Sequence, residues 1–227
     1  MQVGEHLLRL VGRINRVFSR VGNDSFFDPR EFSWSSYLEL NHESILKEIE
    51  GVMANEPIPS LDQLTSSMDT IANKNWLTFI LYGYGIKVEA NCHKCPITTA
   101  LIERIPGVQT VMFSILAAKD GIPVHRGPYG GIILYHLGVK IPEGAWIKVG
   151  DATKYYKKGK SIIFDDTYPH STGNPSDETR IVLFIQFERP YEWPMNIINK
   201  CILFLVSKTG FFREGVRNLK LWEKKEA

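Results

Sequence analysis

The sequence contains few cysteines and no long hydrophobic run. Its three cysteines, Cys92, Cys95 and Cys201, are too few for a disulfide framework, and their odd number favours reduced thiols in a cytoplasmic setting. No stretch approaches the roughly 20 apolar residues that cross a bilayer, and four arginines interrupt the apolar residues near the start, which argues against a secretory signal. We therefore expect a cytoplasmic protein without a membrane-spanning segment.

Several common catalytic and binding motifs are also missing. Gly130 and Gly131 are not followed by the Lys and Ser/Thr of a phosphate-binding loop, and there is no serine-hydrolase elbow. Cys92-x-x-Cys95 has no second pair that would complete a tetrahedral zinc site. We interpret these two thiols as structural, with a redox role as the alternative.

Positive charge is concentrated at the two ends of the chain. The formal net charge is +2, but residues 1–22 carry four Arg against one Glu and residues 200–227 carry seven Lys or Arg against three Glu, so the middle is acidic. Basic ends point to an anionic surface as a partner, whereas the acidic middle argues against binding nucleic acid.

The first of these basic segments has helical periodicity. Between residues 5 and 21, apolar residues and arginines each recur at steps of three and four. One interpretation is a terminal helix packed on the core with a solvated basic face. The other is peripheral contact with the inner face of a membrane, made by residues 5–21 together with the basic C-terminal tail.

The spacing of apolar residues divides the chain into helical ends and a β-rich middle. Residues 34–55, 61–72 and 98–105 have helical spacing, and residues 23–29 read as a loop. Strands are expected at residues 76–82, 108–117, 131–139, 145–149, 160–164 and 180–188, separated by turn residues that include Gly173-Asn174-Pro175. A series of short strands is typical of a barrel or jelly roll.

We therefore predict a mainly β fold, either a barrel or a double-sheet jelly roll, with helical extensions at both ends. The expected core comprises residues 74–190, preceded by a helical extension at residues 1–73 and followed by C-terminal helices at residues 191–227. At this length we expect one domain over residues 1–227.

Two histidines and an arginine in the β-rich region suggest a metal site. His125 lies in a segment rich in Gly and Pro, His170 follows the expected strand at residues 160–164, and Arg180 begins the next strand. In a jelly roll, a return strand of this length brings Arg180 back to the same cavity as His170. Two neutral imidazoles with open coordination positions suit a ferrous ion, and the planar fork of an arginine suits a dicarboxylate cosubstrate.

Short motifs around these residues occur in a fixed order between residues 91 and 190. They are Phe113-Ser114, His125-x-Gly127, Tyr135-His136-Leu137-Gly138, Val149-Gly150, Phe164-Asp165-Asp166 with His170, and Arg180-Ile181-Val182-Leu183. Together they resemble the aspartyl/asparaginyl β-hydroxylase family of iron(II)- and 2-oxoglutarate-dependent oxygenases. Asn91-Cys92-x-x-Cys95-Pro96, Ile105-Pro106-Gly107 and the segment from His125 to Tyr129 are most similar to the branch that contains bacterial lipid A 2-hydroxylases.

The resemblance implies that the mainly β core is a double-stranded β-helix, the cupin-like jelly roll, and it implies a role for each matching residue. It implies His125 and His170 as ligands of iron(II), Arg180 as the partner of the distal carboxylate of 2-oxoglutarate, and Ser114 and His136 as further contacts of that cosubstrate. With O2, and with ascorbate as a supporting reductant, such an enzyme hydroxylates an unactivated C–H bond while 2-oxoglutarate becomes succinate and carbon dioxide.

Two positions depart from the family pattern. Gly127 stands where most such oxygenases have an acidic third ligand, as in the β-hydroxylases that leave this position to water. Leu134 stands where the family usually has an arginine, which argues mildly against an anionic peptide substrate. Either Asp165 or Asp166 could orient a ligand imidazole.

Three functions follow from these residues. The first is hydroxylation of a lipid acyl chain, and the alternative is β-hydroxylation of a peptidyl Asp or Asn. The third is a non-catalytic, cupin-like protein in which the two histidines hold a metal without turnover.

Overall fold

The computed structural model describes residues 11–12, 16–64, 74–207 and 218. Its strands are β1 (Phe26–Phe27), β2 (Trp76–Gly83), β3 (Ile86–Lys87), β4 (Val108–Leu116), β5 (Asp120–His125), β6 (Ile132–Lys140), β7 (Trp146–Val149), β8 (Ala152–Tyr155), β9 (Ser161–Phe164), β10 (His170–Asn174) and β11 (Arg180–Glu188). They form a seven-stranded sheet of order β1-β9-β6-β11-β4-β2-β3 and a four-stranded sheet of order β5-β10-β7-β8. All pairs are antiparallel, and the arrangement confirms the predicted jelly roll.

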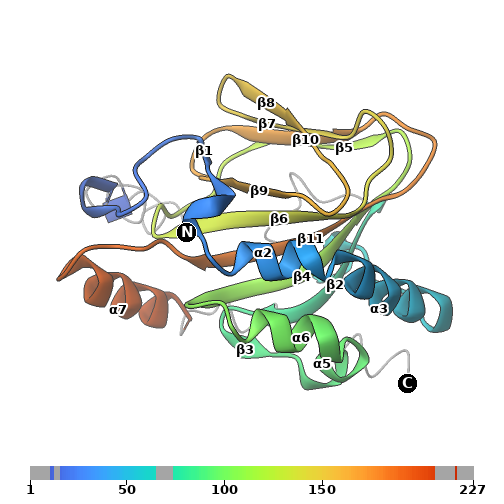
Figure 1. Ribbon diagram of the computed structural model, residues 1–227, viewed down its shortest axis with the longest axis horizontal. Coiled ribbons are helices and arrows are strands. Elements are labelled where there is room, and N and C mark those ends of the chain that lie inside the picture. Colours follow the sequence, from blue (N-terminus) through green and yellow to red (C-terminus); the bar gives the residue numbers. More distant parts are fainter. Residues whose placement is uncertain (1–10, 13–15, 65–73, 208–217, 219–227) are drawn as a thin grey trace.

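Helices cover one side of the larger sheet. The described helices are α2 (Ser35–Leu40), α3 (His42–Asn55), α4 (Leu61–Leu64), α5 (Glu89–Lys94), α6 (Pro96–Ile102) and α7 (Met195–Ser207), with short 3-10 turns η1 (Arg16–Phe18) and η2 (Pro29–Glu31). Figure 1 shows the smaller sheet on one side of the larger sheet and α3, α5 and α6 on the other. None of the described helices combines the length and the apolar composition that crossing a membrane requires.

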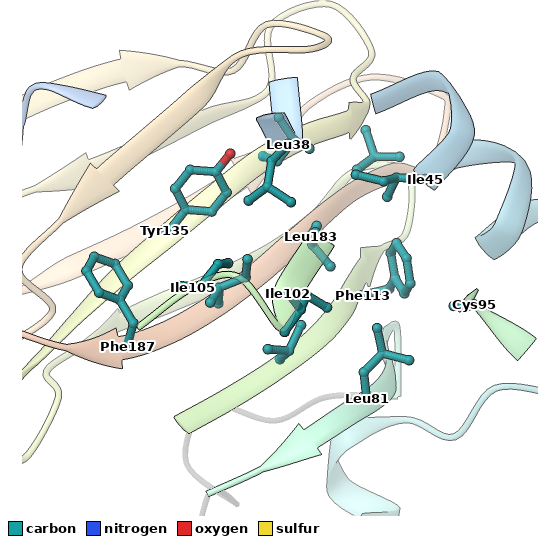
Figure 2. Close-up of a cluster of buried hydrophobic side chains, with 14 of the residues drawn as sticks. Leu38, Ile45, Leu81, Cys95, Ile102, Ile105, Phe113, Tyr135, Leu183 and Phe187 are labelled. Atoms are coloured by element: carbon teal, nitrogen blue, oxygen red, sulfur yellow. The ribbon is translucent and has the colours of Figure 1, made fainter. Parts of the chain in front are cut away.

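Strand alternation gives the larger sheet two different buried faces. Along β11, Ile181, Leu183 and Ile185 belong to the main hydrophobic cluster, which α2, α3, α5 and α6 cover; Figure 2 shows part of it. Val182, on the opposite face, packs with Ile147 of the smaller sheet in a second cluster. Successive side chains of a strand point to opposite faces, so the residues between the sheets are the even-numbered ones of β11, and Arg180 is among them.

Several predicted elements are confirmed, and others were wrong. The pair of helices at residues 34–55 and the strands at residues 76–82, 108–117 and 180–188 are present within one or two residues of the predicted bounds. The segment at residues 61–72 is helical only at Leu61–Leu64 among its described residues, and the loop at residues 23–29 contains β1 and the start of η2.

The strands β5, β8 and β10 were not predicted. β5 contains Pro123, whose missing N–H is tolerated because β5 is an edge strand of the smaller sheet. The turn expected at Gly173-Asn174-Pro175 is wrong, because Gly173 and Asn174 belong to β10. A side chain at Gly173 would bring a Cβ to 2.7 Å from the Trp146 ring, so this glycine allows the strand to pass the indole.

The helix expected at residues 5–21 does not extend to residue 21. Residues 11 and 12 are helical and Arg16–Phe18 form a 3-10 turn, after which Ser19 pairs with Tyr191 as an isolated β-bridge. Residues 1–10 and 13–15 of this prediction lie outside the described residues, as does most of the basic tail, where only residue 218 is described beyond α7.

Candidate active site

His125 and His170 lie side by side in the smaller sheet. His125 ends β5 and His170 begins β10, and the two residues are direct partners in the antiparallel register. Their ring centroids are 4.0 Å apart. Strand pairing therefore brings together two imidazoles that are 45 residues apart in the sequence.

Both imidazoles have the same hydrogen-bonding arrangement. Nδ1 of His125 lies 2.8 Å from the Pro123 carbonyl, and Nδ1 of His170 lies 3.0 Å from the Tyr168 carbonyl. A carbonyl only accepts, so each Nδ1 carries the proton and each Nε2 keeps its lone pair. Burial lowers the pKa of His125, and burial together with the neighbouring His125 lowers the pKa of His170 to about 4. The pair is therefore neutral at physiological pH, the form that binds a metal.

Gly127 closely approaches Asp166. The Gly127 N–H donates to the Asp166 carbonyl at 2.7 Å, and a Cβ on Gly127 would overlap Oδ2 of Asp166. The position two residues after His125 thus has no room for an acidic side chain while Asp166 keeps its place. Within the part of the chain that the structure describes, no group of three or more His, Cys, Asp or Glu residues is arranged to hold a metal ion.

Arg180 lies in the layer between the sheets and is 1% exposed. Its guanidinium donates to the Thr172 hydroxyl at 2.7 Å and to the Ser114 hydroxyl at 3.4 Å, and it lies 5.3 Å from the centre of the Tyr156 ring. Among the described residues no carboxylate is within ion-pair distance, and Nε has no hydrogen-bond partner. A buried cation without a carboxylate is costly, which makes this position suited to an anionic ligand.

His136 completes this group from β6. It is 7% exposed, and its Nδ1 shares a hydrogen bond of 2.9 Å with the Tyr156 hydroxyl. Its Nε2 has no hydrogen-bond partner among the described residues. Burial, and then the positive charge of Arg180, hold the pKa of His136 well below its usual range. Its ring contacts Phe164, which also contacts His170, at centroid distances of 5.0 and 5.6 Å.

The structure brings together all five residues singled out from the sequence, and it adds three others. Thr172 and Tyr156 contact Arg180, and the Trp76 indole donates to the Ser114 hydroxyl at 2.9 Å. Thr172 follows His170 by two residues on the same face of β10, a spacing that becomes informative only once β10 is known to be a strand. Tyr156 and Trp76 have no comparable signal.

Next to this polar group the two sheets are apolar. Leu134, Ile147, Val149, Ile162, Phe164 and Val182 form a buried cluster between them. Leu134 shares its face of β6 with His136 and is 3% exposed. The site is therefore polar around Arg180 and apolar beside His136.

The carboxylates that follow β9 have different surroundings. Asp165 forms a fully buried ion pair with Arg189, whereas Asp166 lies against Gly127. Asp166 is thus in contact with the segment that follows His125.

This chain is similar in sequence to a known protein family and to individual proteins from other organisms. The model of a family described as Aspartyl/Asparaginyl beta-hydroxylase matches residues 39–190. An ornithine lipid ester-linked acyl 2-hydroxylase from Rhizobium tropici is 36% identical over 217 residues, which cover 93% of this chain and 77% of the relative. Aspartate beta-hydroxylase domain-containing protein 2 from Homo sapiens is 30% identical over 162 residues, 67% of this chain and 44% of the relative, so the chain spans less than half of that protein.

Solved structures of low sequence identity are also similar in part. A Cupin_2 domain of an XRE family transcriptional regulator from Enterobacter cloacae is 13% identical, with a TM-score of 0.34, and the match covers 51% of this chain and 99% of that domain. A Cupin 2 conserved barrel domain protein from Salinispora arenicola is 11% identical, with a TM-score of 0.34 and coverage of 57% and 86%.

Proposed function

This chain belongs to the aspartyl/asparaginyl β-hydroxylase family, and from that premise we propose that it is an iron(II)- and 2-oxoglutarate-dependent hydroxylase. The family relation supports a hydroxylase; the proposal adds the metal, the cosubstrate and the residues that hold them. The observation that carries it is Arg180, a buried guanidinium with no carboxylate partner among the described residues, in the same layer as two imidazoles.

His125 and His170 would hold the iron through Nε2, because their Nδ1 atoms donate to backbone carbonyls. With two histidines as its protein ligands, such an iron would keep further coordination positions open for small molecules. When bound, iron and 2-oxoglutarate supply the oxidising power that converts a C–H bond to C–OH, with O2 consumed and succinate and carbon dioxide released.

Arg180 and its neighbours would bind the distal carboxylate of 2-oxoglutarate. Ser114 accepts from Trp76 and Arg180, so its own hydroxyl proton remains available for a carboxylate oxygen. If Nδ1 of His136 accepts from the Tyr156 hydroxyl, Nε2 carries a proton and can donate to the same cosubstrate. The protein thus contributes positioning and exclusion of water rather than oxidising power.

We propose a lipid acyl chain as the substrate. The apolar cluster beside His136 suits an alkyl chain, and the buried Leu134 leaves no cation there for an anionic side chain. The Rhizobium tropici relative, which is named for hydroxylating the ester-linked acyl chain of an ornithine lipid, is 36% identical. We also propose that residues 5–21 and the basic C-terminal tail contact the membrane that contains this lipid.

The chemistry is tested by succinate release from 2-oxoglutarate with iron(II), ascorbate and oxygen, first with no other substrate added. We expect release by the wild type, loss in His125→Ala and His170→Ala, and no change in His93→Ala, because His93 is exposed on α5. Release that does not depend on His170 would contradict the assignment. If the protein bound metal tightly but released no succinate with any substrate tried, a non-catalytic cupin-like protein would be favoured instead.

The substrate is tested by mass spectrometry of two candidates under the same conditions. An ornithine lipid should gain one oxygen on its ester-linked acyl chain, and peptides that contain Asp or Asn should not change. If only the peptide were hydroxylated, the proposal of a lipid substrate would be wrong, and a peptidyl Asp or Asn would take its place. Flotation of liposomes with protein that lacks residues 1–22 tests the membrane contact, since unchanged binding would exclude residues 5–21 as the contact.

A further inference from the structure

Helix α7 carries apolar side chains that are largely exposed. Met195, Asn199 and Leu203, spaced by four residues, are 8%, 1% and 8% exposed and attach the helix to the rest of the protein. Other large apolar side chains, on the helix and just before it, point away from the rest of the protein. We call them the α7 face: Trp193, Ile197, Ile198 and Leu205, which are 76%, 53%, 42% and 65% exposed.

The surroundings of the α7 face extend its apolar and basic character. Val17 and Phe18 are 81% and 38% exposed. The backbone of Phe18 accepts from the Glu192 N–H, which places these two residues next to the start of α7. In the sequence, the basic segment at residues 1–22 includes Val17 and Phe18, and the basic segment at residues 200–227 begins within α7. Figure 1 shows α7 projecting at the edge of the molecule.

We propose that the α7 face docks this protein on an anionic lipid bilayer. Exposed leucine, isoleucine and aromatic side chains flanked by cations are the composition of a helix that lies in a membrane interface. The described part of α7, Met195–Ser207, lacks the length and apolar composition that crossing a bilayer requires, and we place it along the surface. The proposal rests on the proposed lipid substrate, and it adds the element that inserts.

The docking helix is connected directly to the segment that follows His125. Asn199 of α7 accepts a hydrogen bond from the Tyr129 hydroxyl at 2.7 Å and donates to the Gly131 carbonyl at 3.1 Å. Tyr191, just before the helix, donates to the Gly130 carbonyl at 2.9 Å. These buried contacts fix the orientation of α7 relative to the β5–β6 connection, so a bilayer that binds α7 is held at a defined position relative to the candidate iron site.

The test is flotation of full-length protein with vesicles of phosphatidylglycerol and phosphatidylcholine in equal parts, without iron or 2-oxoglutarate. Leu205→Glu removes a leucine that would be buried in the bilayer and adds a negative charge, so it should weaken binding by about tenfold or more. The matched control is Leu40→Glu, because Leu40 is 80% exposed on α2 and the same substitution there should leave binding unchanged. Vesicles of phosphatidylcholine alone should bind the wild type more weakly.

Equal binding of the two variants, or no flotation of the wild type, would overturn the proposal. A wild-type dimer that Leu205→Glu converts to a monomer would also overturn it and assign the α7 face to a second copy of the chain. The lipid substrate is tested separately from vesicle binding. An ornithine lipid dispersed in detergent should be hydroxylated equally by the wild type and Leu205→Glu, because no bilayer has to be bound. Hydroxylation of peptides only, with vesicle binding that still depends on Leu205, would retain the docking face and remove the lipid substrate.

Discussion

Arg189 and Asp165 form an ion pair in which both side chains are fully buried. Arg189 also donates to the carbonyls of Gly130 and Gly22, at 2.9 and 3.0 Å, and Asp165 accepts from the Thr167 N–H at 2.9 Å. The pair therefore joins the end of β11 to the segment between β9 and β10 and to the one that follows His125. Arg180, at the other end of β11, is equally buried but has no such carboxylate among the described residues. The two arginines should therefore respond differently to substitution.

Replacing Arg189 should destabilise the protein strongly. Arg189→Met removes one partner of a buried pair and leaves the Asp165 carboxylate without its cation, which costs about 3–5 kcal/mol of unfolding free energy. Urea unfolding, followed by circular dichroism, measures this loss. The control is Arg20→Met, because the Arg20–Glu192 pair is largely exposed and its loss should cost less than about 1 kcal/mol. Similar losses in both variants would contradict the structural role of the buried pair.

Replacing Arg180 should affect the cosubstrate instead of the fold. Arg180→Met abolishes an uncompensated buried charge, so the unfolding free energy without ligands should change by no more than about 1 kcal/mol in either direction. The lost charge-assisted hydrogen bonds should raise the KM for 2-oxoglutarate by about 10- to 100-fold, with a smaller effect on kcat. A second measurement is the Tm, which 2-oxoglutarate with iron(II) should raise in the wild type and not in Arg180→Met. An unchanged KM would remove Arg180 from the cosubstrate site.

The close approach of Gly127 and Asp166 predicts an energetic coupling between them. A methyl group at position 127 would collide with the Asp166 carboxylate, so Gly127→Ala should destabilise the protein by about 1–3 kcal/mol. In the Asp166→Ala background the colliding atoms are gone, and the same substitution should cost much less. A double-mutant cycle by urea unfolding measures the difference, and additive effects would contradict it.

The same contact predicts the outcome of restoring a conventional third ligand. Gly127→Asp should lower metal affinity because the new carboxylate must displace Asp166 and distort the segment that follows His125. Titration with cobalt(II) under anaerobic conditions compares this variant with the wild type. Tighter cobalt binding by Gly127→Asp would show that the site accepts a third ligand.

The parts of the fold that could be predicted are those whose buried residues form a regular apolar pattern in the sequence. The strands β4 and β11 are long runs of apolar residues, and the pair α2 and α3 repeats apolar residues at helical spacing. The strands that carry the histidines could not be predicted in the same way. β5 and β10 contain Pro123, Gly121 and Gly173, which are turn residues by composition but suit an edge strand and a close approach to Trp146.

A similar division applies to the candidate site. Short motifs identified His125, His170 and Arg180, because each stands at the beginning or end of a strand within a recognisable run of residues. Tyr156 and Trp76 were missed because their contacts, with His136 and Ser114, span 20 and 38 residues of sequence and exist only after the strands have paired.

The three thiols should differ sharply in reactivity. Cys95 is fully buried, and burial raises its pKa to about 12; burial also raises the pKa of the Cys92 thiol. Cys201 is exposed on α7. Since the thiolate is the reactive form, native protein treated with a disulfide reagent at mildly alkaline pH should lose one thiol rapidly, and denatured protein should lose all three.

The substitution Cys201→Ser should remove the rapid phase, and that result would assign the rapid phase to Cys201. Because Cys201 follows Ile197 by four residues and precedes Leu205 by four, it lies along the α7 face. Anionic vesicles should therefore slow its modification in the wild type and have less effect in Leu205→Glu. Rapid loss of two or three thiols in native protein would mean that Cys92 and Cys95 are accessible and would favour a redox role for that pair over a structural one.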